Sequence, residues 1–120
     1  MPNHTLYRAI RRQRPKLGDF WSDFAHGDAP TGDQLGDPFA WASVSMFNDR
    51  QFAAEQAHNL HQGRFLIELV IPDTQPDVIV RQTGPDPRHF SVMGTPTTLL
   101  ACCASSRGTP VDQLVRPATP

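Results

Sequence analysis

Two serines with the spacing Ser-x-Ser are the first side chains in this sequence that could do chemistry. Ser43 and Ser45 flank Val44 in the segment ASVSM. On a β-strand, both hydroxyls would point to one face and Val44 to the other. The pair would either form a polar strip along a cleft or leave room for a close contact between elements. Neither serine lies in a sharp glycine-bounded turn, and no Ser-His-Asp arrangement can be assembled from the sequence.

Two charged residues interrupt segments that are otherwise typical of β-strands. Arg8 lies within TLYRAI, and Glu68 lies within RFLIELVI. A charged side chain inside a sheet is rarely buried without a partner. We therefore expect Glu68 to form a structural ion pair with Arg8 or Arg81 rather than to act in catalysis.

Other chemical signatures point away from metal and nucleic-acid sites. His58 and His61 lie three residues apart on a predicted helix, but no cysteine or acidic cluster at ligand spacing would complete a zinc site. The basic segment at 11–16 is followed closely by three aspartates, and the net charge is −1. We therefore expect a solvated loop there, with neither a metal nor a nucleic-acid partner. The three aspartates are Asp19, Asp23 and Asp28.

The sequence lacks the common phosphate-binding, dinucleotide-binding and hydrolase motifs, and it has no Cys-x-x-Cys pair. Cys102 and Cys103 are adjacent, a spacing that disfavours a disulfide between them, so we expect free thiols in a reducing compartment. No apolar segment approaches the ~20 residues of a membrane span, and no signal peptide is recognisable at the start. These features predict a cytoplasmic protein without a membrane partner.

The elements that must position these side chains form an α+β pattern. The 120 residues fit one domain, predicted over 1–105 and followed by a tail at 106–120. The late and mostly short strands predict a small, mostly antiparallel sheet with one main helix. The strands are expected at 5–10, 42–46, 64–71, 77–81 and 89–93. Residues 98–104 fit either a helical turn running into a strand or a strand alone.

The main helix is expected from Arg50 to His61, with Asn48 or Asp49 as its N-cap and Gly63 just beyond its end. Its predicted apolar face consists of Phe52, Ala53, Ala57 and Leu60. Residues 17–38 are rich in Gly, Asp and Pro, and they predict a long, partly ordered loop with room for one helical turn at 20–26.

The order of these motifs resembles the ADP-ribosyltransferase fold in a compact bacterial form. Such domains open with a strand carrying Leu-Tyr-Arg or Leu-Tyr-His, matched here by Leu6-Tyr7-Arg8. A variable loop follows, and then a strand with a Ser-x-Ser motif, matched by Ser43-Val44-Ser45. The helix at 48–63 and a strand ending in proline, RFLIELVIP, come next. The block HFSVMGTPTTLLACC is similar to the closing strands of small, uncharacterised actinobacterial relatives, so the resemblance covers residues 5–104.

This resemblance implies a site for NAD as substrate. Arg8 would hold a phosphate or a ribose hydroxyl, Ser43 and Ser45 would shape the nicotinamide wall, and Tyr7 or Phe47 would stack on the ring. The implied activity is NAD-dependent ADP-ribosyl transfer or NAD cleavage, in which Arg8, Ser45 and His89 would be the catalytic side chains. A toxin or modifying effector with a protein target or a cognate inhibitor would fit this activity.

One position departs from the family pattern. The catalytic glutamate of the family normally lies on a late strand, near residues 89–94 here, and PRHFSVMG contains no carboxylate. Asp86 lies just upstream in a turn, and Glu68 lies at another place in the order. The alternative is therefore an inactive module of the same fold that binds a nucleotide or a protein, or an accessory protein without a ligand.

Overall fold

The computed structural model describes residues 3–115, apart from the side chain of Asp33. Its centre is a six-stranded sheet with the order β4-β5-β2-β1-β3-β6, in which every pair of neighbours is antiparallel. This is an α+β fold with one main helix and several short ones, as the sequence predicts. The strands are β1 (Asn3–Ile10), β2 (Val44–Phe47), β3 (Phe65–Pro72), β4 (Ile79–Gln82), β5 (His89–Met93) and β6 (Thr109–Pro110).

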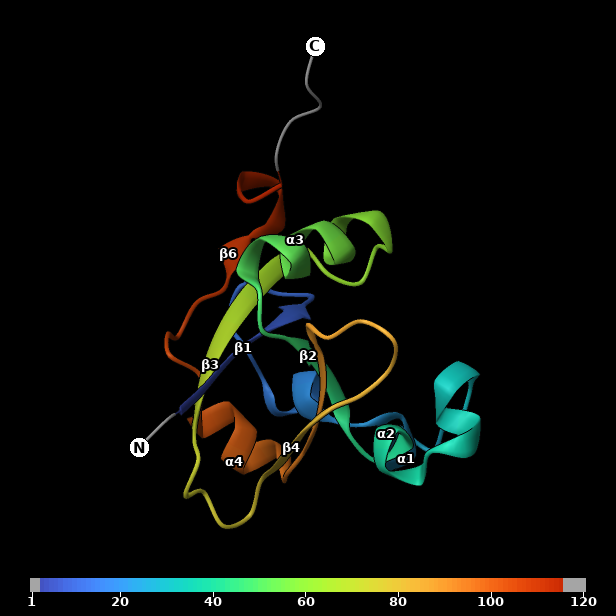
Figure 1. The fold of residues 1–120 in the computed structure, drawn as a ribbon. Coiled ribbons are helices and arrows are strands. Elements are labelled where there is room, and N and C mark those ends of the chain that lie inside the picture. Colours follow the sequence, from blue (N-terminus) through green and yellow to red (C-terminus); the bar gives the residue numbers. More distant parts are fainter. Residues whose placement is uncertain (1–2, 116–120) are drawn as a thin grey trace.

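The helices cover both faces of the sheet (Figure 1). One face packs against α3 and η3, and buried Ala53, Ala54 and Ala57 let α3 approach the strands closely. The other face packs against α4 and η1, around Phe20 and Leu99. The main helix is α3 (Arg50–Asn59), and the shorter ones are α1 (Asp23–His26), α2 (Pro38–Trp41), α4 (Pro96–Ala101), and the 3₁₀ helices η1 (Leu17–Phe20), η2 (Gly32–Gly36) and η3 (Val111–Gln113).

The sheet is nearly split between β1 and β2. Strand β1 pairs with β3 over its whole length, from Asn3 opposite Pro72 to Ile10 opposite Phe65. Between β1 and β2, by contrast, the register contains the single pair Tyr7 and Phe47. Strand β2 instead continues its ladder with β5, where Ser45 lies opposite Ser91. The two halves, β4-β5-β2 and β1-β3-β6, therefore diverge in the middle of the sheet.

The predicted strands are confirmed, with ends shifted by at most two residues, and so is the main helix with Asp49 as its N-cap. The apolar face of α3 differs from the prediction, because Leu60 lies past the end of the helix and is 58% exposed, while Ala54 is fully buried. Gly63 does not act as a helix cap. A Cβ there would lie 2.7 Å from the Ile10 carbonyl oxygen, so glycine is needed where the chain passes the end of β1.

The segment predicted as a loop is mostly short helices, and the sheet continues past residue 105. Residues 17–41 hold η1, α1, η2 and α2 in succession. Strand β6 adds to the edge of β3, and Val111 in η3 is buried against α3. The final five residues of the predicted tail lie outside the described residues. At 98–104, helix α4 is followed by an isolated bridge between Leu69 and Cys103.

Both cysteines are free, as predicted, and burial raises the pKa of each thiol, to about 11 for Cys103. None of the helices in residues 3–115 has the length and apolar character needed to cross a membrane.

We predict that Gly63→Ala destabilises the protein, because the added Cβ would force the chain away from the Ile10 backbone. Overpacking of this kind costs roughly 1–3 kcal/mol. Gly18→Ala is the matched control, since no atom lies within 4 Å of the position that its Cβ would take. Urea unfolding of both variants checks this expectation, and equal stabilities would contradict it.

Candidate functional site

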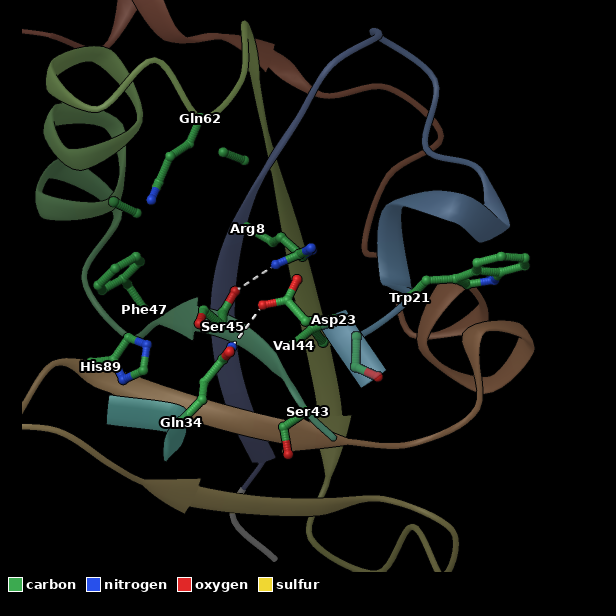
Figure 2. Close-up of a pocket in the computed structure, with 13 residues that line it drawn as sticks. Arg8, Trp21, Asp23, Gln34, Ser43, Val44, Ser45, Phe47, Gln62 and His89 are labelled. Carbon is green, nitrogen blue, oxygen red and sulfur yellow. Dashed lines mark hydrogen bonds between the residues drawn. The ribbon is translucent and has the colours of Figure 1, made fainter. Parts of the chain in front are cut away.

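A cleft of about 400 Å³ lies over the split between β1 and β2 (Figure 2). This volume falls within the range of about 300–1,000 Å³ that is usual for small-molecule sites. Strands β1, β2 and β5 form its floor, while α1 and η2 stand on one side and α3 on another. The residues that line the cleft include Arg8, Asp23, Gln34, Ser45, Phe47 and His89.

Arg8 bridges the split in the sheet. Its Nη1 donates to the Ser45 carbonyl oxygen at 2.9 Å, and its Nε donates to the Asp19 carbonyl oxygen at 2.6 Å. These bonds satisfy two carbonyls, one of them in the part of β2 that β1 leaves unpaired. Burial lowers the pKa of Arg8 to about 10, against the opposing charges of Asp19 and Asp23, so the side chain stays a cation at neutral pH.

Part of the Arg8 guanidinium remains available to a ligand. Among the described residues, no hydrogen-bond partner is found for Nη2. No buried side-chain nitrogen or oxygen in that part of the chain lacks a partner, so Nη2 is not sealed inside the protein. The guanidinium is thus held through Nε and Nη1 and presents a fixed positive charge at the cleft.

The two serines of the Ser-x-Ser motif differ in role. Ser43 is buried, and its hydroxyl donates to the Phe39 carbonyl oxygen at 2.5 Å, which closes the end of α2. Ser45 is exposed in the middle of a central strand, where a side chain is normally covered. The free hydroxyl on the floor of the cleft is therefore that of Ser45.

His89 begins β5 directly opposite Phe47, and their rings meet at a centroid distance of 5.4 Å. Its Nδ1 lies 3.0 Å from the Thr83 carbonyl oxygen, which can only accept, so Nδ1 carries the hydrogen. The Thr83 hydroxyl lies 3.1 Å from the same nitrogen and 2.7 Å from the Ser91 hydroxyl. In the neutral ring, Nε2 is consequently the nitrogen that can accept a proton.

Tyr7 lies outside the cleft, on the face of the sheet that packs against α3. It stands opposite Glu68 in the register, and burial together with that carboxylate raises the pKa of its hydroxyl. The expected ion pair of Glu68 with Arg8 or Arg81 is wrong, since Glu68 pairs with neither arginine. The reason is that Arg8 points toward the split and bonds to carbonyl oxygens instead.

The cleft also contains polar side chains that sequence reasoning missed. Asp23, the first residue of α1, faces the cleft, and Gln34 Nε2 donates to its Oδ2 at 2.7 Å. Gln34 is itself fixed, because its Oε1 accepts from the Thr31 N–H at 3.0 Å. Gln62 enters from the chain after α3 (Figure 2). All three come from segments outside the strands, where no periodic pattern marks a residue as functional.

The sequence matches no protein-family model, no curated protein and no solved structure. Among the described residues, no three His, Cys, Asp or Glu side chains gather as metal ligands.

We predict that Arg8→Met destabilises the fold, because the Asp19 and Ser45 carbonyls lose their donor. An acceptor left unpaired in a buried place costs about 1–3 kcal/mol. Because the bond to Asp19 is only part-buried and the bond to Ser45 is exposed, we expect a total loss of roughly 1–3 kcal/mol. Arg107→Met is the control, since Arg107 is exposed and its guanidinium has no hydrogen-bond partner among the described residues. Chemical denaturation measures both, and a loss for Arg8→Met no larger than for the control would refute the bridging role.

Proposed function

We propose that this chain is an ADP-ribosyltransferase-like domain that binds NAD in the cleft and cleaves its nicotinamide–ribose bond. The observation that carries the proposal is the convergence of Arg8, Ser45 and His89, from three neighbouring strands, on one cleft of about 400 Å³. These are the side chains that the resemblance to that fold assigns to the reaction.

The chemistry of each group supports a dinucleotide ligand. The fixed cation of Arg8 suits a pyrophosphate oxygen or a ribose hydroxyl. The Ser45 hydroxyl and the His89 ring offer hydrogen bonds to the ribose and to the nicotinamide amide. Phe47 provides the aromatic wall, since it lines the cleft and Tyr7 does not. Phe52 packs edge-on against the Phe47 ring at a centroid distance of 5.3 Å.

An inactive binding module is the second candidate, and one observation favours it. On β5, the cleft side carries His89 and the neighbouring Ser91, where the related fold would carry a glutamate. A module of this kind would hold a nucleotide through Arg8 without breaking it. Fold alone does not separate the two candidates, because catalysis depends on the site.

We predict that the wild-type protein, incubated with NAD, gains thermal stability and releases nicotinamide. Ser45→Leu should abolish both effects, because the larger side chain fills the floor of the cleft from an exposed position. Differential scanning fluorimetry measures the stabilisation, and chromatography measures the nicotinamide.

Ser106→Leu is the matched control, since Ser106 is exposed and lies away from this cleft. It should behave as wild type in both assays. A thermal shift without nicotinamide would support the binding module. Neither a shift nor nicotinamide in the wild type would refute NAD as the ligand.

A further inference from the structure

Cleavage of NAD needs an anion near the ribose, and the strand residues that line the cleft include no carboxylate. As the bond between the ribose C1′ and the nicotinamide nitrogen breaks, positive charge develops on the sugar, as in the oxocarbenium-like states of glycoside cleavage. A preorganised anion beside that carbon lowers the barrier. The strand residues that line the cleft are neutral or cationic at neutral pH, with Arg8 as the fixed cation.

Asp23 is the one carboxylate among the described residues that line the cleft. Figure 2 shows its carboxylate between Arg8, Ser45 and Gln34, directed at the middle of the site. Arg8 and Asp23 both line the cleft, and they form no direct ion pair in the described structure. One oxygen, Oδ2, is held by Gln34, while Oδ1 has no hydrogen-bond partner among the described residues.

Helix α1, which carries Asp23, is held in place by contacts with neighbouring segments. Ser22 caps α1 by accepting from the Ala25 N–H at 3.1 Å. Phe24 packs edge-on against Trp41 at a centroid distance of 4.9 Å, and Trp41 Nε1 donates to the Asp28 carbonyl oxygen at 2.8 Å. Helix α1 is thereby tied to α2, which leads directly into β2, so Asp23 is positioned relative to the floor of the cleft.

We propose that Asp23 is the catalytic carboxylate of this site and that Gln34 is its positioning residue. This inference rests on the proposed function. In the step, the C1′–N bond breaks and its electron pair passes to the nicotinamide nitrogen, which becomes neutral. The positive charge moves to the ribose, where the Asp23 carboxylate stabilises it. Water then forms a bond to C1′ and loses a proton to solvent, which yields ADP-ribose and nicotinamide.

Asp23→Asn tests the assignment, because the amide keeps an oxygen for Gln34 but removes the negative charge. We expect kcat for nicotinamide release to fall about 100-fold, the usual scale for one electrostatic group. The thermal shift with NAD should be retained or enlarged, since NAD is itself an anion. Asp28→Asn is the matched control, because it makes the same charge change in the same segment. The hydrogen bond from Trp41 is to the backbone carbonyl of residue 28, so the substitution does not remove it. Asp28→Asn should leave kcat unchanged.

Gln34→Leu is a second test variant, and comparing its kcat with its NAD binding separates a positioning role of Gln34 from a merely structural one. It should lower kcat while Asp23 remains present, without a matching loss of NAD binding. Full kcat in Asp23→Asn, with nicotinamide release by the wild type, would overturn the role of Asp23 and leave the proposed function intact. A wild type that binds NAD but releases no nicotinamide would overturn both the catalytic function and this assignment. Equal losses in Asp23→Asn and Asp28→Asn would also overturn it.

Discussion

The main constraint on this structure is the pairing of backbone groups where the sheet splits between β1 and β2. Buried carbonyls need donors, and two strands that diverge leave them without one. Arg8 solves this problem by reaching from β1 to the Ser45 carbonyl on β2 and to the Asp19 carbonyl in η1. The same constraint determines the site, because the side chain that closes the ladder is also a cation at the floor of the cleft.

The remaining cleft groups follow from this split. Ser45 is exposed in a central strand because β2 pairs with β1 only at its last residue, Phe47, and Ser45 precedes that pair. Strand β5 lies next to β2 in the sheet, and this pairing brings His89 beside Phe47. The short helices at 17–41 fill the space on the other side and carry Asp23 and Gln34 inward. A succession of short helices thus supplies the wall that the strands do not provide.

Strand periodicity allowed much of this arrangement to be predicted, and tertiary context accounts for what was missed. The strands and the capped helix agree with the expectations. The structure also places Arg8, Ser45, Phe47 and His89 along one cleft. Tyr7 does not line the cleft, because it packs against α3 and stands opposite Glu68 on β3. Asp23 was not identified because the fold of 17–41 depends on contacts such as Phe24 with Trp41, distant in sequence.

The proposed dinucleotide site lies at the split between β1 and β2 and is built on Arg8. Titrating ¹⁵N-labelled protein with NAD and following its amide and arginine side-chain signals tests this claim most directly. The account predicts saturable shifts at the Arg8 Nε–H and at the amides of Ser45, Phe47 and His89. Signals near Val111, which is buried beneath α3, should not move. Absent shifts, or shifts confined to residues around Val111 in η3, would contradict a dinucleotide site at the split.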